Sequence, residues 1–351
     1  MVATSITINS RTTGWLRGLT FDSLYIFGTL SVAIAAGSIV IGQPALFLTV
    51  FVLNGWLLGY HHVVSTFTRL SFDSDSFKQH RFLVLWLPIF VLAAVILLSA
   101  VFGVWILVSM YLYWQWWHYT RQSYGVSRIY ARKCGIAPDR ITTAMIYAVP
   151  VWGILYRSYQ APRHYLFADV KVIPIPYWLV VLAAVVALMV TALWASRQLQ
   201  LFLRGELPIG HTAYLLSHLV GFGVAYLLID DINHGWLVLN VWHNSQYILT
   251  VWMFNNSRFK NEANAKHTFL YHLSQTKNVG LYFLVCFLIS TIFYTALASV
   301  LSWVSLTFAA AAALPLVAIV YQSINFHHYV VDAVIWKVRR KTIRENLGIT
   351  G

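Results

Sequence analysis

The stretch NFHHYVVDAVIWKVRR, residues 325–340, places two adjacent histidines and an aspartate at the end of a long apolar segment. His328 and Asp332 are four residues apart, so a helix puts both side chains on one face. An imidazole and a carboxylate on one face can bind the same metal ion, or the carboxylate can fix the histidine tautomer through a hydrogen bond. This segment is therefore a candidate metal site.

Three other segments place histidines in a similar setting: GYHHVVSTFTRL, YWQWWHYTRQSYG and LNVWHNSQYILTVW. Ionisable side chains in membrane helices are costly, and by default they indicate function. The predicted metal ligands from all four segments are His61, His62, His118, His243, His327, His328 and Asp332. Gln122 and Tyr247 lie four residues after His118 and His243 on the same helix faces, and together with Gln246 they are the expected supporting residues. The sequence names no separate catalytic residue.

The donor set favours some metals over others. The two cysteines, Cys134 and Cys286, have no CxxC spacing, so neither a disulfide framework nor a thiolate metal site is expected. Imidazole and carboxylate ligands with open positions suit non-haem iron that reacts with oxygen. One or two iron ions are the expected cofactor, and zinc, copper and haem are the alternatives.

The composition indicates which elements position these residues. Hydrophobic residues make up 59% of the 351 residues and charged residues 10%, which predicts an integral, multi-pass membrane protein. The net charge of +13 comes from short Lys and Arg clusters between apolar runs, so no nucleic-acid surface is expected. A membrane-spanning helix needs about 20 apolar residues. Scanning for such segments predicts spans near 22–41, 45–67, 82–101, 103–124, 140–158, 177–200, 210–230, 235–255, 278–302 and 306–335.

The predicted fold class is an all-α, polytopic transmembrane bundle of about ten spans with both termini in the cytoplasm. Residues 1–20 form a polar N-terminal segment, 21–340 a single transmembrane domain, and 341–351 a cytoplasmic tail. Within the domain, 257–276 is expected to be interfacial. Segment 140–158 is predicted to be a kinked or re-entrant helix, because Pro150 interrupts it.

The positive charges orient this bundle. With both termini inside, most Lys and Arg clusters fall in cytoplasmic loops, as the positive-inside rule requires. The loop with Arg157, Arg163 and Lys171 is the exception. The four histidine-bearing helices then run in one direction, and their histidines are expected to meet near the cytoplasmic face of a bacterial-type inner membrane.

Histidines gathered at the cytosolic ends of membrane helices resemble the integral-membrane non-haem iron oxygenases, hydroxylases and desaturases that act on lipids. The resemblance is one of architecture, since the HxxxH and HxxHH boxes of desaturases do not occur among these residues. It implies an oxidoreductase of lipid metabolism with a lipid or other hydrophobic substrate, O2 and a separate electron donor as partners. The alternatives are a b-type haem protein in which His211 and His218 pair with His118 or His243, and a metal- or proton-coupled transporter.

Overall fold

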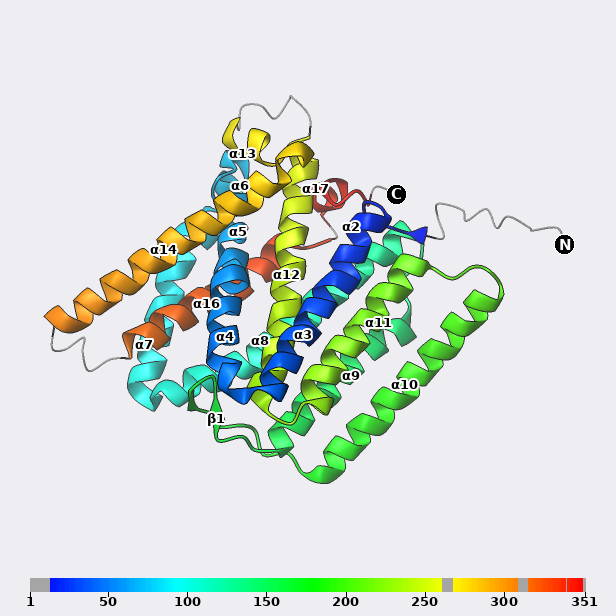
Figure 1. Cartoon of the computed structure of the whole chain (residues 1–351), viewed down its shortest axis with the longest axis horizontal. Coiled ribbons are helices and arrows are strands. Elements are labelled where there is room, and N and C mark those ends of the chain that lie inside the picture. Colours follow the sequence, from blue (N-terminus) through cyan, green and yellow to red (C-terminus); the bar gives the residue numbers. More distant parts are fainter. Residues whose placement is uncertain (1–12, 261–267, 309–314, 339, 350–351) are drawn as a thin grey trace.

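Long helices account for almost all of the chain in the computed structural model, which describes residues 13–260, 268–308, 315–338 and 340–349 (Figure 1). A short hairpin of β1 (His164–Tyr165) and β2 (Ala168–Asp169) is the one sheet within these residues. The predicted all-α class is therefore confirmed. Residues 1–12 of the N-terminal segment, 261–267 of the interfacial segment and 350–351 of the tail lie outside the described part.

Within the described residues, six helical segments are long and apolar enough to cross a membrane. They are Leu19–Gly42, Pro44–Leu70, Phe82–Phe102, Tyr177–Leu203, Ile209–Leu228 and Thr276–Thr307. Each coincides with a predicted span, and together they are compatible with an integral membrane protein. Their regular parts are α2 (Leu19–Ser23), α3 (Thr29–Gly42), α4 (Phe47–Asn54), α5 (Tyr60–Leu70), α7 (Leu87–Phe102), α10 (Tyr177–Leu203), α11 (Ile209–Gly223) and α14 (Val279–Thr307).

The other four predicted spans correspond to helices as well, and residues 309–314 of the predicted span 306–335 lie outside the described part. These helices are α8 (Val104–Lys133), α9 (Arg140–Tyr159), α12 (Ile232–Arg258) and α16 (Leu316–Ile335). Their sequences are not apolar enough to be counted with the six. A total of ten crossings therefore stays a prediction, as does the orientation of the termini. The short helices α6 (Ser74–Gln79), α13 (Thr268–Leu273) and α17 (Lys341–Asn346) complete the fold.

Helix α12 explains why a buried helix can have a modest hydropathy. It lies in the middle of the molecule, between α5 and α3 (Figure 1), and packs against both. Its interior residues include the polar Asn240, Asn244 and Asn255, all buried. Buried polar groups must be paired, and the Asn240 Oδ1 atom accepts from Asn54 Nδ2 at 2.7 Å and from Asn244 Nδ2 at 2.9 Å. The polar side chains of this helix thus face protein partners.

Pro150 lies inside α9 without ending it. A proline has no backbone N–H, so the carbonyl of Ile146, four residues earlier, has no helical donor. The His218 Nε2 atom lies 3.1 Å from this oxygen, and its Nδ1 atom is 2.7 Å from Ser123 Oγ. His218 therefore satisfies the backbone group that Pro150 leaves unpaired, and both of its ring nitrogens are engaged.

Arg157 resolves one part of the charge pattern that did not fit the predicted topology. Its side chain is buried, with 1% of its surface exposed. It donates hydrogen bonds to the carbonyls of Ala225, Ile229 and Asp230, at the end of the helical segment that begins with α11. Cationic side chains commonly satisfy the last carbonyls of a helix. Arg157 therefore belongs to the helix packing, and it is not a loop charge.

A close approach near this contact gives a stability prediction. Gly235 of α12 lies so near the carbonyl oxygen of Ala225 that an added Cβ would overlap it. We expect Gly235→Ala to destabilise the protein by about 1–3 kcal/mol, because a backbone carbonyl cannot move aside. Thermal unfolding in detergent measures this. Gly223→Ala is the matched control, since its Cβ would meet nothing within 4 Å. Equal unfolding temperatures for the two variants would contradict the prediction.

Candidate metal centre

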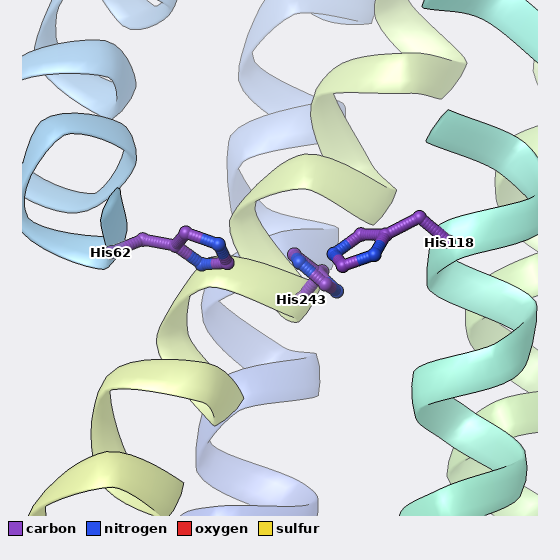
Figure 2. A group of neighbouring side chains, drawn as sticks. All are labelled: His62, His118 and His243. Atoms are coloured by element: carbon purple, nitrogen blue, oxygen red, sulfur yellow. The ribbon is translucent and has the colours of Figure 1, made fainter. Parts of the chain in front are cut away.

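Four helices bring five of the predicted ligands together. His62 comes from α5, His118 from α8 and His243 from α12, and Figure 2 shows the three rings pointing toward one another. One ring nitrogen of each lies within 4.8 Å of one of the others. His118, His328 and Asp332 form a second such group, the last two residues coming from α16. His118 is common to both groups.

The two groups are continuous in space. The Nε2 atoms of His62 and His328 are 2.6 Å apart. The Asp332 Oδ2 atom lies 3.4 Å from His328 Nε2 and 3.9 Å from His118 Nε2. All five side chains are buried. The geometry therefore supplies one compact set of four imidazoles and one carboxylate.

Several atoms of this set are buried without a partner. His62 Nδ1, His118 Nε2 and Asp332 Oδ2 have no hydrogen bond within the described residues. An unsatisfied buried polar atom costs about 1–3 kcal/mol, so three of them so close together need a physical reason. A metal ion bonded to imidazole nitrogens and a carboxylate oxygen supplies one. The donor set therefore fits a metal.

Tyr247 holds the carboxylate in place. Its hydroxyl donates to Asp332 Oδ1 at 2.7 Å and accepts from Trp336 Nε1 at 3.0 Å. Thr66 Oγ1 lies 2.8 Å from the same hydroxyl. Because the single Tyr247 proton is given to Asp332, Thr66 must donate to Tyr247. The contact fixes one carboxylate oxygen and leaves the other directed at the histidines.

The same network assigns a tautomer to His328. Thr66 Oγ1 also lies 3.4 Å from His328 Nδ1. Since the Thr66 proton is used toward Tyr247, its oxygen accepts from an Nδ1–H of His328. The Nε2 atom of His328 is then unprotonated and presents a lone pair to the centre of the site. Thr66 was not among the predicted residues, although its position four residues after His62 is a usable signal.

Two of the predicted ligands are not brought into either group. The His61 ring packs edge-on to Phe283, with ring centroids 6.0 Å apart. His327 Nε2 donates to the Leu83 carbonyl at 2.7 Å. Adjacent residues on a helix point about 100° apart, so only one member of each His–His pair can face the centre. In this arrangement His62 and His328 are the members that face the centre, and the prediction that His61 and His327 are ligands stays a prediction.

The remaining predicted residues lie in different places. Gln246 Nε2 donates to the Tyr25 carbonyl at 3.3 Å, away from the histidines. Gln122 lines a cavity beside the site. His118 lies in the middle of α8, because that helix continues to Lys133, well past the predicted end of the span. His243 lies at the level of the other ligands despite its distance in sequence from the end of α12.

Aromatic rings enclose the imidazoles. Tyr329 stacks on His118 with centroids 4.5 Å apart, and Tyr119 lies 4.1 Å from His243. Asn240 Nδ2 and Gln115 Nε2 donate to the Tyr119 hydroxyl at 2.7 and 2.6 Å. Rings fixed in this way restrict the imidazole orientations and keep bulk water from the ligands.

A partly open cavity of about 920 Å³ reaches the site between α8 and α16. His118, Tyr247 and Asp332 form part of its wall. Its volume lies at the upper end of the range for small-molecule sites in proteins. A substrate in this cavity would lie next to the His118 and Asp332 group, while His62, His243 and His328 are not part of the wall.

His211 and His218, which were considered as haem ligands, belong to neither group of candidate metal ligands. His218 is engaged by Ser123 and Ile146, and His211 Nε2 lies 3.1 Å from Ser127 Oγ. Axial haem ligands need a ring nitrogen directed at the iron. The contacts of these two residues therefore favour helix packing.

Comparison with known proteins found no match to a protein-family model, to a curated protein or to a solved structure.

Proposed function

We propose that the chain is a membrane-embedded, metal-dependent oxidoreductase of the oxygenase, hydroxylase or desaturase type that acts on a lipid or another hydrophobic substrate. The observation that supports it most is the convergence of His62, His118, His243, His328 and Asp332 from four helices, next to a cavity that reaches two of them. In this proposal the centre faces the cytoplasmic side of a bacterial-type inner membrane.

The proposed metal is non-haem iron, as one or two ions. His62, His118, His243, His328 and Asp332 are the residues that would hold it. Bound iron would supply the reaction of O2 with an unactivated C–H bond, which protein side chains cannot perform. For a hydroxylation, one oxygen atom enters the C–H bond and the other leaves as water, with two electrons and two protons from a separate donor.

The residues of the chain have three tasks in this proposal. Tyr247 and Thr66 orient Asp332 and His328 through the hydrogen bonds described above. Tyr329 shields His118. The cavity positions an apolar segment of the substrate beside His118 and Asp332 and excludes water from it, which protects reactive species from side reactions.

The first test is the metal itself. We expect the protein, purified without added metal, to contain one or two iron ions per chain by elemental analysis. Removing them with a chelator is expected to lower the unfolding temperature, since a ligand present at 100 times its Kd stabilises the folded state by about 2.7 kcal/mol. Metal content at background, with no response to the chelator, would refute the proposed centre.

The second part of the same test concerns the reaction. Metal-loaded protein in lipid nanodiscs should consume O2 when both a hydrophobic substrate and an electron donor are present. Chelator-treated protein is the control. Tight metal binding without any such O2 consumption would retain the site and reject the oxidoreductase.

A further inference from the structure

Besides Arg121, three cationic residues line the cavity. They are Arg128, Arg132 and Lys337. We propose that they bind the anionic head, carboxylate or phosphate, of an amphipathic substrate whose apolar chain extends along the cavity toward His118 and Asp332. This inference rests on the proposed function, because it names the substrate class of the same site.

The spacing along α8 supports the arrangement. His118, Arg121, Gly125, Arg128 and Arg132 follow one another at intervals of three and four residues and therefore share one helix face. All five line the cavity. At the rise of an α-helix, Arg128 lies about 15 Å and Arg132 about 21 Å along the axis from His118. An anion bound by these arginines would thus lie about 15–21 Å from His118 along the helix axis, a distance that an extended hydrocarbon chain can cover.

The charges of the cavity wall are unbalanced. Asp332 is the only acidic residue that lines it within the described chain, and its oxygens face Tyr247 and the histidines. Arg128 and Lys337 are half-buried, and Arg132 is exposed. None of the three has a side-chain hydrogen bond or ion pair with the part of the chain that the structure describes. Arg121 differs, because it donates to the Tyr147 hydroxyl and lies over Trp117 and Tyr124.

Unpaired guanidinium groups are well matched to the proposed head. Arginine forms paired hydrogen bonds with carboxylate and phosphate, and such charge-assisted bonds are stronger than neutral ones. Gly125 lies between His118 and Arg128 along α8, and Val334 of α16 also lines the cavity. A Cβ added to Gly125 would meet nothing within 4 Å, so the space beside it is open. The chain of an amphiphile can pass there.

Binding experiments test this inference independently of catalysis. Quenching of tryptophan fluorescence reports ligand in the cavity, since Trp114, Trp117 and Trp336 line it. The probes are hexadecanoate, hexadecyl phosphate, hexadecanol and propionate, each added to chelator-treated and to metal-loaded protein in the same detergent. We expect the two long-chain anions to bind at least about tenfold more tightly than hexadecanol, and propionate not to compete. The better of the two anions identifies the head.

Substitutions in the cavity wall test where the anionic head of the substrate binds. The double variant Arg128→Gln/Arg132→Gln should lose the preference for anions while keeping the affinity for hexadecanol and the metal content. The control is Arg204→Gln, an exposed residue outside the cavity wall, which should keep the preference. Gly125→Leu should weaken all long-chain probes and leave the metal in place.

The outcomes separate the two proposals. Equal affinities for hexadecanoate and hexadecanol, or an anion preference that survives the double variant, would overturn the inference, even if the metal is present. Competition by propionate at the affinity of hexadecanoate would show an anion site without a chain channel and would also overturn it. Anion preference in a protein that holds no metal would instead support the binding site and reject the metal-dependent function.

Discussion

Replacing His118 by alanine is expected to release all bound metal while the helical fold is retained. His118 belongs to both groups of candidate ligands, and its Nε2 atom has no other partner among the described residues. Loss of a residue that only supports a ligand lowers metal affinity about 10- to 100-fold, so loss of a shared ligand should exceed this. Elemental analysis of the purified variant, with circular dichroism to confirm helicity, measures the effect.

His327→Ala is the matched control. His327 is buried, like His118, and lies beside a candidate ligand, but its Nε2 atom donates to the Leu83 carbonyl. We expect this variant to keep its metal and to lose only the net contribution of one hydrogen bond, about 1 kcal/mol of stability. Wild-type metal content in His118→Ala would count against the centre. So would loss of metal in His327→Ala alone.

The helical architecture follows from the sequence because membrane helices leave a strong local signal. About 20 apolar residues in a row predict a helix wherever they occur, and the six most apolar segments agree with the structure within a few residues. The predicted end of the span in α8 was less accurate. Helix α8 continues to Lys133, because Arg128, Arg132 and Lys133 can end an apolar segment without ending a helix.

The number of crossings could not be derived with the same certainty. Helices α8, α12 and α16 carry the site, and their polar residues lower the hydropathy that identifies a span. Asn240 and Asn244 show why, since each is paired with another side chain in the interior. Hydropathy measures composition, and it does not register whether a polar group has a partner.

The sequence indicated residues that the structure brings together, and their role as metal ligands stays a prediction. Histidines in apolar segments pointed to His62, His118, His243 and His328, and helical spacing pointed to Asp332 and Tyr247. Sequence alone could not decide which histidine of each adjacent pair faces inward, because that depends on helix rotation. Thr66 lies four residues after His62, which is a local signal, but its contact with His328 and the stacking of Tyr329 on His118 depend on how the helices pack.

Asp332→Asn is expected to lower metal affinity more than Tyr247→Phe does, and the order of these effects distinguishes a ligand from its support. The asparagine side chain has the shape of aspartate and can still accept the Tyr247 hydrogen bond through its oxygen. Its amide nitrogen then replaces Oδ2, the atom nearest His328 Nε2 at 3.4 Å, and an N–H group cannot bind a metal ion. We expect a loss of metal affinity of more than about 100-fold for Asp332→Asn and about 10- to 100-fold for Tyr247→Phe, measured by metal titration.

Asp139→Asn, which removes an exposed ion pair with Arg197, is the control and should bind metal normally. If Tyr247→Phe lost more metal than Asp332→Asn, the carboxylate would be a support and not a ligand, since its removal would then matter less than that of the hydroxyl that orients it.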